Sequence, residues 1–340
     1  MKKKVISATV AVILLITLLW LTQLLLVPKY MSNPKEGALI AEYFNEKTPH
    51  DVIFVGDCEV YEGVSPITLW EEYGITSYIR GSSQQLIWQS YYLLEETFKY
   101  EKPKAVVFNV LSVKYGEPQK EEYNRMTLDG MKMSSTKINA IKASMTEEEN
   151  MLSYFFPLLR YHSRWSELTA DDFKYMFYRD TVSHNGYLMQ TGIKPMPDAD
   201  IPIEELSDYT LPETSMAYLD KMAKLCKDNG VELILIKSPT NTWKYWWYDE
   251  WDAQIVDFAN ENDLAYYNFI DECDEIGIDW SQDTYDGGVH LNVYGVEKFS
   301  DYFGKILSEE HNIPDNRGDT ELAAVWEQKA EKYYNEKNSK

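Results

Sequence analysis

The sequence predicts an α/β protein, with a doubly wound parallel sheet, a largely helical insertion after the third strand, and one apolar helix in front. Three observations lead to this prediction. Short, continuous apolar runs alternate with helical patterns along most of the chain, as in sheets that helices cover on both faces. The stretch from about 112 to 211 breaks that alternation. One long uncharged apolar run lies within the first 30 residues.

Composition limits the class of protein. The 340 residues include 33 Lys plus Arg against 55 Asp plus Glu, a formal net charge of −22, and 44% are hydrophobic. This balance is typical of a globular chain long enough to bury a full core. Nucleic-acid binding is not expected, because phosphate contacts need clustered basic residues and the chain has such a cluster only at Lys2–Lys4. Three Cys are too few for a disulfide framework.

The N-terminal apolar run indicates the compartment. Val5–Val27 holds 23 uncharged residues, enough to cross a bilayer core of roughly 30 Å. The lysines before it place residues 1–4 in the cytoplasm and the rest of the chain outside, by the positive-inside rule. A cleaved signal peptide is the alternative, but no small-x-small cleavage site follows the run. We therefore expect an uncleaved signal anchor at 5–27, a single pass, and a linker at 28–50.

Apolar runs predict the strands in order. They are Asp51–Val55, Ile75–Ile79, Ala105–Val110, Val231–Ile236 and Ala265–Phe269. Helical patterns follow at Leu86–Tyr100, Ser215–Asn229 and Val293–Leu307. Together these elements predict one α/β domain at 51–310, interrupted by the insertion at about 112–211. Since the insertion follows the third strand, it could stand at the carboxyl edge of the sheet, where ligand crevices form. Residues 311–340 are expected to be a solvated, partly helical tail.

Chemistry-bearing residues follow the strand ends. Gly56-Asp57-Cys58-Glu59 comes directly after the first strand, where a nucleophile would be exposed and its own N–H could face a developing oxyanion. Near the C-terminus, the block from Asp283 to Asn292 places His290 close behind carboxylates, just before a helix. A nucleophile needs this arrangement, because it supplies a base and a group that fixes the tautomer of the base.

These blocks resemble the SGNH (GDSL-type) hydrolases. The resemblance rests on Gly56-Asp57-Cys58-Glu59, Gly81-Ser82-Ser83, Asn109 and the Asp…His-Leu-Asn block, in that order, over about 51–307. It is nearest to the membrane-anchored branch that includes alginate acetylation proteins and the D-alanine-transfer protein of teichoic acid operons. The resemblance implies a flavodoxin-like sheet and hydrolysis or transfer of acyl esters on carbohydrate.

The resemblance also implies roles for single residues. Cys58 stands where the family has its nucleophilic Ser, and His290 matches the general base. Gly81 stands where a backbone N–H joins the oxyanion hole, and Asn109 is a candidate for the side-chain oxyanion donor. Asp286 is the nearest match to the orienting acid, although the family spacing is Asp-x-x-His and three residues intervene here.

The spacing leaves three alternatives for the orienting acid. The loop could bulge at Gly287-Gly288 so that Asp286 reaches His290, since glycine permits such a bulge. Alternatively, Asp283 orients His290, or no acid does.

The Ser-to-Cys replacement leaves two interpretations open. A thiolate can form a thioester, so that transfer becomes plausible beside hydrolysis. Asp57 and Glu59, however, disfavour a thiolate by their negative charge. The alternative is that Cys58 is an inert, small hydrophobic residue.

Basic and aromatic residues are candidates for substrate contact. Arg160 and Arg164 lie among aromatics in the insertion, and Lys237 and Trp243 follow the fourth strand. Arg and aromatic rings suit a sugar or an anionic polymer. No His or Cys cluster has metal-ligand spacing and no phosphate-binding loop is present, so we expect neither a metal nor another cofactor.

Two functions remain possible from the sequence. One is an extracytoplasmic, membrane-anchored acyl-ester hydrolase or O-acyltransferase that acts on cell-surface carbohydrate. The other is a catalytically inactive glycan-binding or assembly subunit with the same fold. Both predict the lipid bilayer and a cell-surface glycan as partners, with a multi-spanning membrane acyltransferase as a further candidate.

Overall fold

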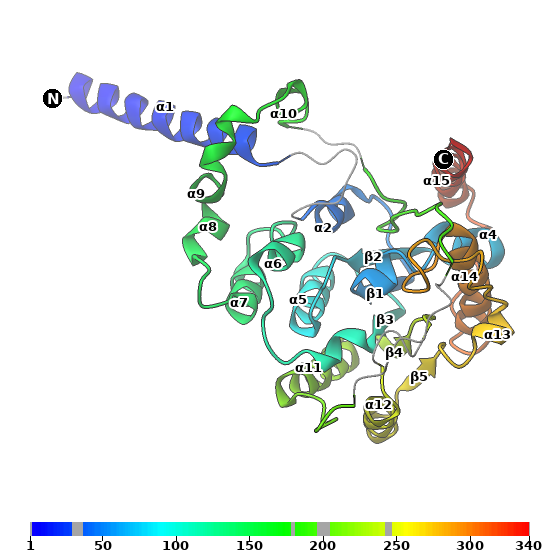
Figure 1. Ribbon diagram of the computed structural model, residues 1–340. Coiled ribbons are helices and arrows are strands. Elements are labelled where there is room, and N and C mark those ends of the chain that lie inside the picture. Colours follow the sequence, from blue (N-terminus) through cyan, green and yellow to red (C-terminus); the bar gives the residue numbers. More distant parts are fainter. Residues whose placement is uncertain (1, 29–36, 178–180, 196–204, 242–246, 340) are drawn as a thin grey trace.

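The computed structural model describes residues 2–28, 37–177, 181–195, 205–241 and 247–339, and these form one five-stranded sheet flanked by helices (Figure 1). The strands are β1 (Val52–Gly56), β2 (Ser77–Gly81), β3 (Ala105–Asn109), β4 (Glu232–Lys237) and β5 (Ala265–Asn268). All neighbours pair in parallel, in the order β2-β1-β3-β4-β5. This is the flavodoxin-like order, whose direction reverses between β1 and β3. The predicted fold class is confirmed.

Successive strand residues face opposite sides of the sheet, and helices bury both sides. In β1, Val52 and Phe54 join one apolar cluster, whereas Ile53 and Val55 join another. The first cluster includes α4 (Pro66–Tyr73), α13 (Cys273–Ile276) and α14 (Val293–Glu309), and the second includes α5 (Ile87–Thr97), α11 (Glu213–Asn229) and α12 (Asp249–Asn262). Burial on both faces explains why the strands are continuous apolar runs in the sequence.

The insertion is helical, as predicted, and its first part packs outside α5. Its elements are η2 (Val110–Lys114), α6 (Glu121–Leu128), α7 (Ser135–Ser144), α8 (Met151–Phe155), α9 (Leu158–Tyr161), η3 (His162–Ser166) and α10 (Ala170–Lys174). A satellite apolar cluster joins Leu128, Ile141 and Tyr154 to Leu93 of α5 and to Ile40 of α2 (Ala38–Glu42), which η1 (Tyr43–Asn45) follows.

A later part of the insertion reaches the carboxyl edge of the sheet. The N–H of Leu188 donates to the carbonyl of Tyr61 at 2.8 Å, in the short helix α3 (Cys58–Tyr61). The N–H of Lys194 donates to the carbonyl of Thr284 at 2.9 Å. The structure therefore places only part of the insertion at this edge.

One described helix, α1 (Lys2–Leu26), is long and apolar enough to span a membrane. It projects from the rest of the molecule (Figure 1), and its residues from Lys2 to Trp20 are exposed. The signal anchor expected at 5–27 coincides with this helix.

The C-terminal region differs from the prediction. Residues 320–339 form α15 (Thr320–Ser339), which packs against α4 and is no solvated tail. Trp326 and Tyr333 are fully buried, and the Trp326 ring stacks on Trp70 of α4 with centroids 5.2 Å apart. The physical reason is a narrow apolar stripe of Trp326, Ala330 and Tyr333, at helical spacing within an otherwise charged segment.

Candidate active site

The candidate site lies at the carboxyl edge of the sheet, where the strand order reverses. Cys58 begins α3 directly after β1, and Asn109 is the last residue of the neighbouring strand β3. Ligands of open α/β sheets bind in the crevice at this point. Asp286 and His290 come from the loop before α14.

A sharp turn presents Cys58. Gly56 has φ 154°, and a Cβ built on it would lie 2.6 Å from a methyl carbon of Val60. Another residue at position 56 would therefore push α3 away from the strand end. Asp57 then caps α3, with its carboxylate accepting from the N–H of Glu59 at 3.1 Å. Cys58 is the first helical residue, so its N–H has no partner within the helix.

Asp286 and His290 are in direct contact. Nδ1 of His290 lies 2.7 Å from one carboxylate oxygen of Asp286, while the other oxygen accepts from the N–H groups of His290 and Val289 at 2.9 and 3.1 Å. Gly287 and Gly288 have φ of 87° and 94°, and they form the bulge that brings the carboxylate back to the ring.

Asp283 lies elsewhere. Its carboxylate accepts from Nζ of Lys298 at 2.6 Å and from the N–H of Asp279 at 2.7 Å. Of the two aspartates considered from the sequence, the structure places Asp286 against the His290 ring and gives Asp283 a structural contact beneath the loop.

The His290 ring lies next to the Cys58 side chain, close enough for each group to shift the pKa of the other. Because Nδ1 faces Asp286, Nε2 is the nitrogen left for the sulfur. Burial works to raise the pKa of Asp286, but the hydrogen bonds from the His290 ring and backbone outweigh it and lower that pKa. Asp286 is therefore a carboxylate at neutral pH, and it holds the imidazole in one orientation.

The sulfur and the imidazole titrate together. Burial and then the Asp57 charge raise the pKa of Cys58 to about 11, against the hydrogen bond from His290. Burial works to lower the pKa of His290, but its contacts with Asp286 and Cys58 outweigh burial and raise it to about 11. The share of that rise that comes from the charge of Cys58 exists only when the sulfur is a thiolate, so the value of about 11 belongs to the thiolate–imidazolium pair and not to a ring beside a neutral thiol. At neutral pH the sulfur rests as a thiol.

Asp57 controls how easily a thiolate can form. It is buried, and burial followed by the charge of Glu59 raises the pKa of Asp57 to about 7. Above that pH its carboxylate is charged and opposes a negative sulfur next to it. The site therefore disfavours a resting thiolate, and the thiol proton can pass to His290 only while that ring is neutral.

A second carboxylate near His290 was missed from the sequence. Glu62 is buried and accepts from the Tyr285 hydroxyl at 2.8 Å and from the Gln190 amide at 3.1 Å. The Tyr285 ring stacks on the His290 ring, with centroids 6.0 Å apart and planes 18° apart. The available signal was the spacing, because Glu62 follows Cys58 by four residues and so shares a helix face with it.

A buried polar network lies beside the thiol turn. Glu59 accepts from Nζ of Lys237 at 2.7 and 2.9 Å and from the Asn109 amide at 3.0 Å. That amide also donates to the Ser238 hydroxyl at 2.6 Å. Both amide hydrogens of Asn109 are thus engaged, and Lys237 is fully buried.

This network corrects two expectations. Asn109 has no free amide hydrogen for an oxyanion, and Lys237 cannot contact substrate because it neutralises Glu59 in the interior. The physical reason in both cases is the buried Glu59 carboxylate, whose desolvation must be offset by nearby donors.

The other candidates are distributed unevenly. Gly81 pairs with Gly56 in the β1–β2 ladder, so it lies beside the Cys58 turn. Arg160 pairs with Glu121 at 2.5 Å, and Arg164 pairs with Asp172 at 3.0 Å, on elements next to α1 (Figure 1). The structure does not bring these two arginines to Cys58. Trp243 lies outside the described residues.

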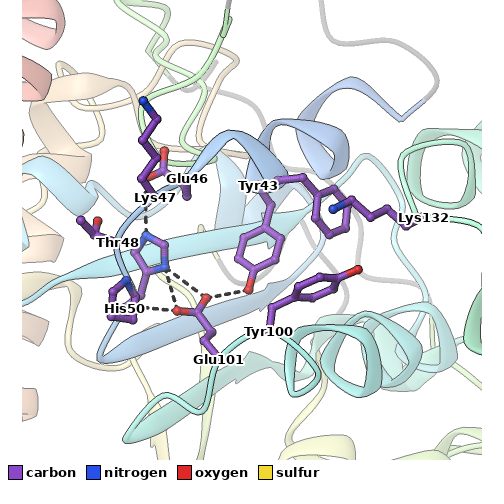
Figure 2. Close-up of a pocket in the computed structure, with 10 residues that line it drawn as sticks. Tyr43, Glu46, Lys47, Thr48, His50, Tyr100, Glu101 and Lys132 are labelled. Atoms are coloured by element: carbon purple, nitrogen blue, oxygen red, sulfur yellow. Dashed lines mark hydrogen bonds and ion pairs between the residues drawn. The ribbon is translucent and has the colours of Figure 1, made fainter.

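Another His–carboxylate cluster lines a cavity at the opposite edge of the sheet (Figure 2). The cavity has a volume of about 390 Å³. Glu101 accepts from the Tyr43 hydroxyl and the N–H of His50, both at 2.7 Å, and its carboxylate lies 3.1 Å from Nδ1 of His50. Nε2 of His50 lies 3.7 Å from Glu46. No Ser or Cys is among the described residues that line this cavity.

Comparison with known proteins gives limited similarity. A protein-family model matches residues 196–312, less than half of the chain. No curated protein matches the chain. Among solved structures, it is similar to a candidate acylhydrolase from Bacteroides fragilis, with 12% identity and TM-score 0.37 over 78% of this chain and 89% of that one. It is also similar to a GDSL-like lipase from Bacteroides thetaiotaomicron, with 13% identity and TM-score 0.37 over 79% and 95%. Similarity this low supports no statement about activity.

Proposed function

We propose that this protein is an extracytoplasmic, membrane-anchored acyl-ester hydrolase or O-acyltransferase that acts on cell-surface glycan. One observation carries the catalytic part, namely the series of contacts from Cys58 to His290 to Asp286 at the carboxyl edge of the sheet. The apolar helix α1 behind a basic tip supports the membrane anchor and a cytoplasmic N-terminus. The glycan substrate rests on the resemblance to SGNH hydrolases of surface polymers.

The chemistry would proceed in two steps. The Cys58 sulfur attacks the acyl carbonyl carbon while His290 takes the thiol proton. The ester C–O bond then breaks, His290 returns that proton to the leaving alkoxide, and a thioester remains. Water or a sugar hydroxyl attacks the thioester carbonyl and gives its proton to His290, and the sulfur leaves and regains a proton. Water as acceptor completes hydrolysis, and a sugar hydroxyl completes transfer.

The remaining roles follow from position. Asp286 holds the imidazole through Nδ1 and stabilises the imidazolium as it forms. The N–H groups of Cys58 and Gly81 are the backbone candidates for the oxyanion hole. A multi-spanning membrane acyltransferase is the candidate partner that would supply an acyl group in a transfer reaction.

The test is intact-protein mass spectrometry of the full chain after incubation with an activated acetyl ester. The wild type should gain one acetyl group that maps to Cys58, or release acetate if turnover is too fast for trapping. Cys58→Ala and His290→Ala should do neither while keeping the wild-type melting temperature. Full ester turnover by either variant would exclude this mechanism.

A second candidate function is a non-catalytic glycan-binding or assembly subunit. Two observations favour it, the raised pKa of Cys58 and the engagement of both amide hydrogens of Asn109. In that case the wild type would show neither adduct nor acetate, and Cys58→Ala would retain the glycan binding of the wild type.

A further inference from the structure

Large apolar side chains gather on the surface of residues 151–177. This segment holds α8, α9, η3 and α10. Six of its large apolar residues are more than half exposed: Leu152, Phe156, Leu159, Trp165, Phe173 and Phe177. Single exposed apolar residues are ordinary, but six of them within 27 residues of one segment indicate an interaction surface.

The segment lies against the end of α1 (Figure 1). A guanidinium nitrogen of Arg164 donates to the carbonyl of Leu26, the last residue of α1, at 2.7 Å. The Phe177 ring contacts the Trp20 ring, with centroids 6.2 Å apart. These two independent contacts fix the position of the segment along the axis of α1.

These contacts order the segment by depth. Leu26 is the last residue of α1, and Trp20 lies six residues before it, about 9 Å further along the helix axis. Arg164, paired with Asp172, is thus level with the end of the apolar helix, where a membrane surface would lie. Phe177 is level with a position inside the apolar run. The charged pair Arg164–Asp172 thus lies at the end of the apolar helix, and the Phe177 ring lies beside its apolar part. Helices in a membrane interface have the same division of charged and aromatic residues.

We propose that residues 151–177 are a second membrane attachment, which lies in the outer interface of the same bilayer that α1 crosses. Trp165, Phe173 and Phe177 would insert among the lipids beside α1. This inference rests on the membrane anchor of the proposed function but is independent of the catalytic part. Two attachments would hold the sheet domain in one orientation toward the membrane, and Arg164 would connect them.

Lipid is favoured over a protein partner because one of the exposed rings, Phe177, lies against Trp20 on the apolar surface of α1 itself. Arg160 and Arg164, which the sequence suggested for substrate contact, then have another use. They neutralise Glu121 and Asp172, and so remove two charges that would oppose contact with the bilayer.

The test uses the purified full chain in nanodiscs of phosphatidylcholine with a minor share of phosphatidylglycerol and a diazirine-bearing phospholipid. After irradiation, mass spectrometry maps the lipid adducts. Adducts are expected in α1 and in residues 151–177, and none at Val256 of α12, an exposed apolar residue away from α1. Labelled α1 with an unlabelled segment would overturn this inference alone. If neither is labelled, the membrane anchor fails as well.

A charge-substituted variant sharpens the test. Phe173→Glu combined with Phe177→Glu should lower the adduct yield of residues 151–177 several-fold, with the yield in α1 unchanged. Val256→Glu is the matched control and should change neither yield. Since the chain is purified alone, adducts that persist at the wild-type level in the double variant would mean that these two rings do not insert.

Discussion

Two histidines occupy opposite edges of the same sheet, each against a carboxylate. His50 contacts Glu101 and Glu46 beneath the amino ends of the strands (Figure 2). His290 contacts Asp286 above the carboxyl ends. The His50 side chain is 1% exposed and the His290 side chain 14%.

The two clusters differ in the group next to the second ring nitrogen of each histidine. The second nitrogen of His50 lies 3.7 Å from the carboxylate of Glu46, so the groups on both sides of that ring favour its protonated form. The second nitrogen of His290 faces a thiol, to which a proton can be returned. A His–carboxylate contact is therefore no sign of catalysis by itself, and the partner of the other nitrogen decides its use.

The largest expected difference concerns replacement of each histidine by alanine. His290→Ala should lower ester turnover by about 10³-fold or more, since the base is lost. The same change should leave the melting temperature close to that of the wild type. His50→Ala should do the reverse and lower the free energy of unfolding by about 3 kcal/mol, because Glu101 and Glu46 lose the group between them. Equal effects of the two variants on activity per folded molecule would contradict the comparison.

The effect of His50 should also depend on pH. Burial works to lower its pKa, but the hydrogen bonds and charges of Glu101 and Glu46 outweigh burial and raise it. A group with a raised folded-state pKa stabilises fully below its unfolded pKa, near 6.5, and that stabilisation is lost as the pH rises through the folded value. His50→Ala should therefore cost more stability near pH 6 than at alkaline pH. Urea unfolding at both pH values measures this, and a pH-independent difference would argue against a charged His50.

The next effect separates the two aspartates near His290. Asp286→Asn keeps the size of the side chain but removes the charge that stabilises the imidazolium, so turnover should fall about 10²-fold or more. Asp283→Asn should weaken the contact with Lys298 and lower the melting temperature, with turnover per folded molecule within a few-fold of the wild type. Steady-state kinetics beside thermal melts would check both, and the opposite pattern would transfer the orienting role to Asp283.

The smallest effect concerns the charge next to the thiol. Asp57→Asn keeps an oxygen that can accept from the Glu59 N–H but removes the charge that raises the pKa of Cys58. The pH profile of Cys58 alkylation by iodoacetamide should therefore move to lower pH. The pH dependence of the free energy of unfolding should change too. Because the folded-state pKa of Asp57 is raised, its ionisation lowers the stability of the wild type as the pH rises from 3.8 to about 7. The variant should lack that decline. An unmoved alkylation profile would remove Asp57 as a control on the thiol.

The strands were predictable because they are buried on both faces, which leaves continuous apolar runs such as Ala105–Val110 in the sequence. The packing of α15 was not predictable, because only Trp326, Ala330 and Tyr333 face the core and charged residues surround them. A narrow stripe of this kind resembles an exposed helix until its partner, Trp70, is known.

At the site, positions were predictable and partners were not. Cys58 and His290 follow from motif order and strand-end placement. The engagement of Asn109 and Lys237 depends on Glu59, which comes from another element and meets them only through the strand order. Glu62 could have been found from its spacing to Cys58, but its contacts with Tyr285 and Gln190 join three distant parts of the chain.

The burial of α15 has a consequence for biogenesis. This helix closes one side of the core, yet it is made after every other element described. The sheet domain therefore exposes the Trp70 side of its interior throughout synthesis. If α1 enters a translocation channel as soon as it emerges, the rest of the chain can follow while it is still open. Late closure would thus keep the domain competent for export and allow it to fold only on the far side of the membrane.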